Sequence, residues 1–220
     1  MTDTLNNGDV LTQTALQQIM GWLIAGETWT YASASTFTIS GDVTTKYPVG
    51  TKIKLTQTTV KYFYVIGTSY GAPNTTITVT GGSDYSLANA AITSPYYSYA
   101  DCPQGHPIWF NWVTTATGFT AAVVFTQSVF RIVGSMCETL ARGLSGTSNA
   151  TTFTWTVPIA CIATVNFLDT PVCIDNGGNI QGRSDLGANT TVIMYSSIAA
   201  GVWTNSGQKG LYAAQFKYPY

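Results

Sequence analysis

Charged side chains are scarce in this chain. Asp, Glu, Lys and Arg make up 9% of its 220 residues, whereas an ordinary soluble domain has about a quarter. Nine cations and ten acids leave a formal net charge of −1, which offers no basic patch for nucleic acid or for a membrane surface. Apolar runs stay short of the roughly 20 residues that a membrane-spanning helix needs. We therefore expect neither a nucleic-acid partner nor membrane insertion.

Side chains that carry catalysis or bind metals are also few. His106 is the single histidine, and it lies in a Pro/Gly-rich loop, so a base for nucleophilic catalysis is poorly supplied. No two of the four cysteines have the close spacing of a zinc knuckle, and we expect them to be buried and reduced in a cytoplasm. These scarcities predict no enzymatic activity, no metal and no cofactor.

Glycan cleavage stays open as a remote alternative. A glycosidase needs two carboxylates about 5–10 Å apart, and the acids of this chain are scattered. Asp175 and Asp185 flank one Gly/Asn-rich loop and could meet in space. Turn chemistry explains Asp175 better, because it stands directly before Asn176-Gly177.

Threonine, glycine and tyrosine take the place of charge, with 36, 21 and 13 copies. Branched and aromatic side chains fit the pleated surface of a sheet. From Trp29 onward apolar and polar residues alternate with period two, as in Val60–Ile66, and Gly, Pro and Asn clusters separate the runs. The pattern predicts an all-β protein.

One segment departs from this pattern. In residues 11–25, four apolar side chains have the i, i+3, i+4, i+7 spacing of a helical stripe: Leu16, Ile19, Met20 and Leu23. The sequence therefore predicts a short N-terminal α-helix. Its stripe either packs on its own domain or serves as an attachment and oligomerisation surface.

The strand runs fall into two series separated by a Thr/Ala/Gly-rich stretch. We predict an N-terminal attachment helix segment over 1–28, then a small antiparallel β-barrel or sandwich over 29–115. Long Gly/Asn turns between the later strands predict a jelly-roll-like β-sandwich over 116–220.

Aromatic side chains of the second series are the best candidates for binding a receptor. An aromatic ring can stack on a sugar, while amide groups bind its hydroxyls. We expect such a site at Trp203, Asn205, Tyr195 and Trp155, with Trp203 foremost because it stands next to the turn Asn205-Ser206-Gly207. The alternative is that these rings pack in the core or at a subunit interface.

Several sequence blocks follow one another over roughly residues 5–112, namely Gly26–Thr38, Gly50–Gln57, Lys61–Ile66, Asn74–Gly82 and Ala91–Ser98. Together they resemble a module of tailed-bacteriophage virion proteins of the tail-fibre or receptor-binding type. Residues 113–220 are similar to the trimeric β-sandwich heads of phage fibres, through Gly146–Trp155, Asp175–Gly178 and Leu211–Tyr220.

The resemblance implies a structural virion protein that is assembled in the host cytoplasm. We expect a homotrimer that contacts other virion proteins through its N-terminal region and a host surface glycan or protein through its distal half. Three weak sites held together would gain avidity. A capsid decoration or head-fibre protein is the alternative, and it needs no receptor site.

Overall fold

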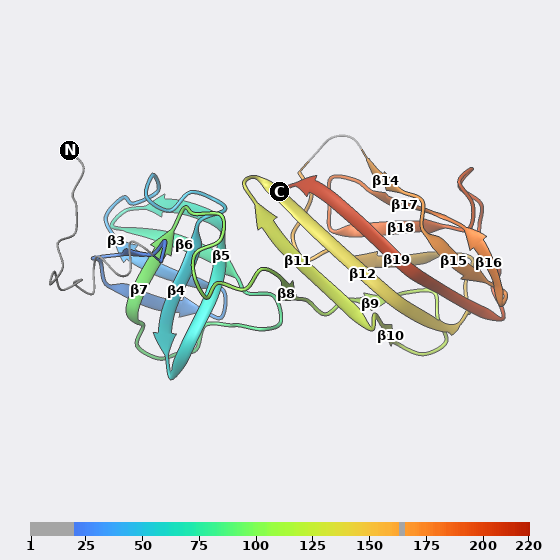
Figure 1. The fold of residues 1–220 in the computed structure, drawn as a ribbon, viewed down its shortest axis with the longest axis horizontal. Helices are drawn as coiled ribbons and strands as arrows, with labels where there is room; N and C mark the ends of the chain where they lie inside the picture. The colour runs from blue at the N-terminus through green and yellow to red at the C-terminus, as the bar shows by residue number, and fades with distance from the viewer. Residues whose placement is uncertain (1–19, 163–165) are drawn as a thin grey trace, which may run out of the picture. The chain divides into compact units, whose positions relative to one another are not determined.

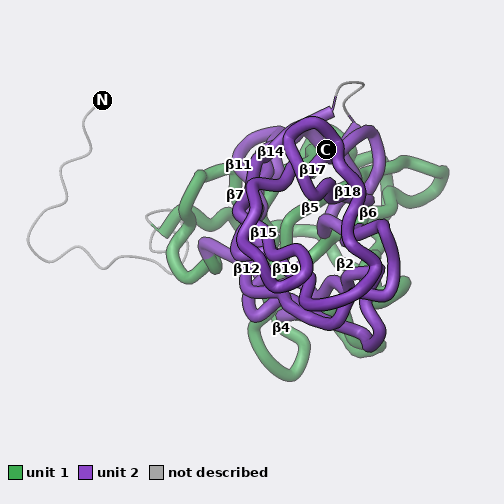
Figure 2. The backbone as a smooth tube through the Cα atoms, turned by 90° about the vertical axis from the view of Figure 1, so that its right-hand side faces the viewer, with its two compact units in different colours: residues 1–80, 85–107 green, residues 81–84, 108–220 purple. Residues whose placement is uncertain are grey.

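The computed structural model describes residues 20–162 and 166–220. The backbone forms two compact units (Figures 1 and 2). Within the described residues, the first unit contains 20–80 and 85–107, and the second contains 81–84 and 108–220. The second unit thus includes a four-residue segment that lies between two stretches of the first.

These units differ from the predicted domains at both boundaries. The predicted division at 115/116 falls inside the second unit, where β8 (Phe110–Asn111) pairs with β11 (Gln127–Val133). The predicted division at 28/29 falls inside the first unit, because β1 (Leu23–Ile24) pairs with β7 (Thr93–Ser98).

The predicted helix over 11–25 is not present in the part of it that the structure describes. Residues 11–19 lie outside the described residues. Met20 and Gly21 form a turn, with Gly21 in the left-handed region at φ 79°, and Leu23 pairs with Tyr97 of β7. The helical prediction was wrong for residues 20–25, because pairing with β7 supplies backbone partners that a short, marginal helix cannot match.

The first unit is built on one seven-stranded antiparallel sheet with the order β1-β7-β4-β5-β6-β3-β2. The remaining strands are β2 (Trp29–Ser33), β3 (Thr36–Ser40), β4 (Lys52–Gln57), β5 (Thr59–Gly71) and β6 (Asn74–Thr80). The register between β5 and β6 shifts between Val65 and Gly67, which is the irregularity that bends a strand and lets a sheet curl.

The core of the first unit comes from alternate residues of these strands. Phe37 and Ile39 on β3, and Ile77 and Val79 on β6, are all buried. The rings of Trp29 and Phe37 stack with centroids 4.5 Å apart, and Tyr47 meets Trp29 edge-on at 5.7 Å. Burial of this set follows the period-two pattern of the sequence.

The second unit has a six-stranded sheet, β16-β15-β19-β12-β11-β8, a four-stranded sheet, β13-β18-β17-β14, and the pair β10-β9. Its further strands are β9 (Thr115–Ala116), β10 (Val123–Val124), β12 (Met136–Thr147), β13 (Phe153–Thr156), β14 (Phe167–Asp169), β15 (Val172–Asp175), β16 (Gly178–Gln181), β17 (Arg183–Leu186), β18 (Thr191–Tyr195) and β19 (Gln208–Pro219). All of their pairings are antiparallel.

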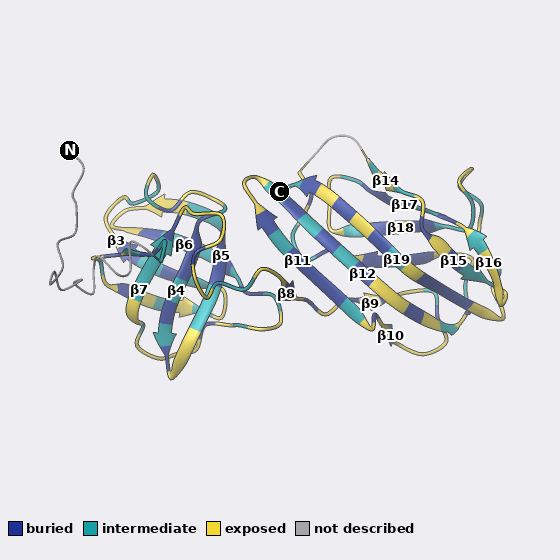
Figure 3. Cartoon of the chain, viewed as in Figure 1, coloured by how far each residue is buried: buried dark blue, intermediate teal, exposed yellow. Residues whose placement is uncertain are grey.

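The two larger sheets meet through their inner faces, as in a β-sandwich. Trp155 of β13 and Phe216 of β19 have ring centroids 5.9 Å apart, and both are buried. Figure 3 shows buried residues alternating with intermediate or exposed ones along much of β12 and β19. The all-β prediction is confirmed, and a sandwich-like second unit agrees with the expected architecture. No helix in residues 20–162 or 166–220 has the length and apolarity needed to cross a membrane.

Candidate functional site

The outer face of the six-stranded sheet carries a row of charged side chains across three strands. Arg131 on β11 lies opposite Glu138 on β12, and Glu138 lies opposite Lys217 on β19. Side chains of directly opposed residues on one face of a sheet are neighbours. The next row on this face contains Val129, Leu140 and Gln215.

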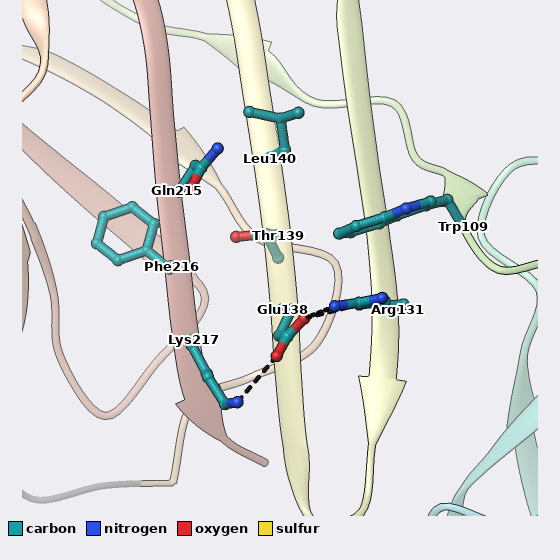
Figure 4. Close-up of a pocket in the computed structure, with 8 residues that line it drawn as sticks. All are labelled: Trp109, Arg131, Glu138, Thr139, Leu140, Gln215, Phe216 and Lys217. Carbon is teal, nitrogen blue, oxygen red and sulfur yellow. Dashed lines mark hydrogen bonds and ion pairs between the residues drawn. The ribbon is translucent and has the colours of Figure 1, made fainter. Parts of the chain in front are cut away.

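Glu138 pairs with both cations of its row (Figure 4). Its Oε2 accepts hydrogen bonds of 2.7 Å from Nε and Nη2 of Arg131, and its Oε1 lies 2.9 Å from Nζ of Lys217. Hydrogen bonds from Lys217 and Arg131 hold the pKa of Glu138 below its usual value. The carboxylate therefore stays ionised in mildly acidic solution.

Trp109 lies over this row and is oriented by it. The guanidinium carbon of Arg131 is 4.7 Å from the centroid of the Trp109 ring, which is a cation–π geometry. Figure 4 shows the indole extending across β11 toward Leu140 and Thr139. The Trp109 residue is 39% exposed, so its ring is held in place and still reaches solvent.

Together these side chains form an open groove with a volume of about 460 Å³. Charged side chains stand on one side of it, and the Trp109 ring and Leu140 supply its apolar part (Figure 4). The residues that line it are Trp109, Arg131, Glu138, Thr139, Leu140, Gln215, Phe216 and Lys217. We call this set the outer-face groove.

Further along the same face, the charge is again cationic. Arg142 lies on the outer side of β12, opposite Gln127 and Ala213, and is exposed. Asp169 lies at the edge of β19, where its carboxylate oxygens accept the backbone N–H groups of Gln215, at 2.9 Å, and Thr170, at 2.8 Å. At the opposite edge, the carboxylate of Asp84 accepts the backbone N–H and Nδ2 of Asn111 on β8. The face thus presents three cationic side chains and Glu138, with backbone-bonded carboxylates, Asp84 and Asp169, at its edges.

Two of the four predicted receptor-binding residues point into the core. Trp203 is 2% exposed, its Nε1 donates to the Met194 carbonyl at 2.7 Å, and its ring meets Phe153 at 5.3 Å. Trp155 is 1% exposed and packs against Phe125 and Phe216. Their ring faces are enclosed, which corrects the expectation that they stack on a receptor and matches the core-packing alternative.

The other two predicted residues reach the surface but belong to different environments. Asn205 is exposed in the turn before β19. Tyr195 is half-buried at the end of β18, with the Arg183 guanidinium carbon 4.6 Å from its ring centroid. A further aromatic residue of this unit, Tyr212, is 51% exposed. Its hydroxyl donates a 3.1 Å hydrogen bond to Oδ1 of Asn179.

The four residues of the predicted attachment helix do not lie together on a helix in the described part of the chain. Leu16 and Ile19 lie outside the described residues, Met20 is in a turn, and Leu23 is in β1. Neither Met20 nor Leu23 lies on a helical stripe. The prediction that the N-terminal region contacts other virion proteins stays a prediction.

The acids considered for glycan cleavage have separate partners. The carboxylate of Asp175 accepts the N–H and hydroxyl of Thr204 at 3.1 Å each. Asp185 is 7% exposed and pairs with Arg183, with both oxygens at 2.8 Å from guanidinium nitrogens. The two carboxylates therefore have different hydrogen-bond partners, Thr204 for Asp175 and Arg183 for Asp185.

The four cysteines are free. Cys137, Cys161 and Cys173 are buried as expected, whereas Cys102 is exposed, so the expectation of burial was wrong for that residue. Gly67–Gly71 has the Gly-x-Ser-x-Gly spacing of a nucleophile elbow, but it runs as a strand within β5, with Ser69 opposite Thr76, and not as a strand-to-helix turn. No group of three or more His, Cys, Asp or Glu in the described part of the chain could hold a metal ion.

The outer-face groove was not foreseen from the sequence. Its charged row joins Arg131, Glu138 and Lys217, and Lys217 lies far along the chain from the other two. The available signal was that charge is so scarce in this chain that any three charges on neighbouring strands stand out. The chain matches no protein-family model, and no curated protein matches it.

Proposed function

We propose that this chain is a structural virion protein of a tailed phage, a homotrimeric tail-fibre or receptor-binding component. It would attach to the host surface without cleaving a surface glycan. The observation that carries the proposal is the outer-face groove, which concentrates charge and a held, exposed tryptophan on a chain that is otherwise poor in charge. Such a cluster on a stable scaffold suits recognition.

The sandwich-like second unit supports the same proposal. A jelly-roll-like head would be the distal, binding part of the protein, and the region around the first unit would join other virion proteins. In a trimer three copies of the groove would act together, so weak individual sites would give firm attachment through a high effective concentration.

The first test is the mass of the purified chain in solution, together with its location on intact virions. We expect a particle of three times the 23.5 kDa chain mass, antibody labelling at the tail tip, and a reduction of phage adsorption when free protein is added in excess. A monomer that is absent from virions would overturn the proposal.

The location of the label separates the proposal from its closest alternative. Copies spread over the capsid, with no effect of free protein on adsorption, would identify a decoration or head-fibre protein. Heat-unfolded protein at the same concentration is the control for nonspecific inhibition of adsorption.

A further inference from the structure

We propose that the outer-face groove binds an acidic oligosaccharide, with a sugar ring against Trp109 and a carboxylate at Arg131 and Lys217. The inference rests on the proposed attachment function and names the class of ligand that the groove would recognise. Three features of the groove carry it: a row with two cations and one acid, hydrogen-bond donors that the internal ion pairs do not use, and an aromatic ring held beside them.

The charge of the Arg131–Glu138–Lys217 row favours an anionic ligand, because the row holds two cations and one acid. Arg142 adds a third cation on the same face, and the carboxylates of Asp84 and Asp169 at the edges of the face are bonded to backbone N–H groups. Glu138 is shared between Arg131 and Lys217 and can neutralise only one of them. A second carboxylate, supplied by a ligand, would complete the charge balance of the row.

The internal pairs also leave hydrogen-bond donors for such a ligand. Arg131 uses Nε and Nη2 in its pair with Glu138, and its guanidinium has five N–H groups in a planar fork. Lys217 has three N–H donors, its side chain is 60% exposed, and its pair with Glu138 uses one of them. Charge-assisted bonds of this kind are the strong ones.

The aromatic and apolar part of the groove favours a sugar over a small inorganic anion. The Trp109 ring is fixed on one side by the Arg131 guanidinium at 4.7 Å and is partly exposed. The electron-rich face of an aromatic ring attracts groups with partial positive charge, and the C–H groups of a sugar ring are of that kind. Leu140 extends this apolar surface, and the Gln215 amide can bind hydroxyls.

The spacing of the cations along the sheet favours a chain of sugars over one. Arg142 is four residues beyond Glu138 on β12, which corresponds to about 13 Å along a strand. An acidic residue at the groove and another further along the same glycan could therefore meet separate cations. Nucleic acid is less well matched, because its binding relies on a longer track of cations along the backbone.

The test measures binding of oligogalacturonate to the full-length protein by isothermal titration calorimetry. We expect binding that weakens as salt is raised, and that falls at least tenfold when the same oligosaccharide is methyl-esterified and thus uncharged. The Lys217→Gln and Trp109→Ala variants should each lower the affinity at least fivefold.

A matched control is available on the same strand. Gln208 is exposed at the start of β19, and Gln208→Glu changes the net charge by the same single unit as Lys217→Gln. We expect Gln208→Glu to retain wild-type affinity. Thermal unfolding of each variant shows whether a loss of binding reflects a loss of folding.

Several outcomes would overturn the inference. Equal loss in Lys217→Gln and Gln208→Glu would indicate a general charge effect and no site. Equal binding of polyphosphate would indicate an anion site without sugar recognition, and tighter binding of single-stranded DNA would identify a different class of partner. The inference would also be overturned if oligogalacturonate did not bind and if the Lys217→Gln and Trp109→Ala variants blocked phage adsorption as well as the wild type does.

The inference and the proposed function fail in different ways. If the protein is a virion trimer that blocks adsorption but binds no acidic glycan, attachment stands and the ligand class is wrong. If it binds oligogalacturonate through Trp109 and Lys217 but is absent from virions, the binding site stands and the virion role is wrong.

Discussion

His106 lies among aromatic rings of the first unit, with its own ring 4.9 Å from that of Tyr64, 5.8 Å from Tyr62 and 6.1 Å from Trp22. Its pKa is lowered from 6.5 to about 4, chiefly by burial and also by the charge of Lys52, while hydrogen bonds with the Phe63 and Pro107 carbonyls oppose the shift. The surroundings therefore favour the neutral imidazole.

This environment predicts that the first unit loses stability on acidification. The unfolded chain binds a proton near pH 6.5 and the folded chain only near pH 4, so the stabilisation present above pH 6.5 is lost as the pH falls toward 4. The loss is about 2–3 kcal/mol. Unfolding in denaturant at pH 7.5 and 4.5 measures it.

The His106→Gln variant isolates the contribution of this residue from that of the carboxylates, which also titrate in this range. We expect its stability to fall less between the two pH values than that of the wild type. An identical fall in both proteins would show that His106 does not contribute.

The need for glycine at position 82 is explained by the residues that pack around it. Gly82 has a φ of 61°, and a Cβ added there would lie 2.0 Å from the Asn111 carbonyl oxygen. Side chains larger than hydrogen are therefore excluded by close backbone approach. In the sequence this glycine reads only as part of a generic Gly-Gly turn.

At the scale of the element, β19 has two roles. It lines the outer-face groove with Gln215, Phe216 and Lys217, and its buried Lys209 bonds to other segments of the second unit. Lys209, near the start of β19, is 0% exposed. Its Nζ donates to the carbonyls of Gly118 at 3.1 Å, Ala150 at 2.7 Å and Thr152 at 3.0 Å. Burial lowers the pKa of this ammonium group, and the three carbonyls compensate for its desolvation.

We predict that Lys209→Met destabilises the second unit by about 3 kcal/mol, because buried carbonyls would lose their donor. Lys217→Met on the same strand should change the free energy of unfolding by less than about 0.5 kcal/mol, since its side chain is 60% exposed. Chemical denaturation of both variants compares them. Equal stability of the two would contradict a fixing role for Lys209.

At the scale of the whole molecule, the two units do not follow the order of the chain. Residues 81–84 belong to the second unit, and Asp84 accepts the backbone N–H of Asn111 at 2.8 Å and its Nδ2 at 2.9 Å. Asp84 thus supports β8, the edge strand of the six-stranded sheet, although residues 85–107 of the first unit lie between them in sequence.

We expect Asp84→Ala to speed hydrogen exchange in residues 110–133 about fivefold, which corresponds to about 1 kcal/mol of local stability. Asp42→Ala is the matched control. Asp42 accepts two hydrogen bonds from Thr44 in a turn of the first unit, so its loss should leave exchange in residues 110–133 unchanged. Unchanged exchange in Asp84→Ala would show that the segment does not support β8.

Sequence reasoning succeeded where the signal is local. The alternation in Val60–Ile66 and the Gly/Asn turns predicted strands, and strands are present there. It failed at Leu23, where a short apolar stripe resembled a helix but the residue joined a sheet through a partner 74 positions away, Tyr97. It also failed at Trp203, because position beside a turn does not reveal the direction of a side chain.

The amino-acid sequence by itself determined that this protein is all-β and poor in charge, because side-chain alternation and composition act on each segment separately. Only the tertiary structure decided which residues share a face. The register between β11, β12 and β19 places Arg131, Glu138 and Lys217 in one row, and the same packing encloses Trp155 and Trp203. Register and facing are set by contacts between distant segments, and one step of slip would exchange the two faces of a strand.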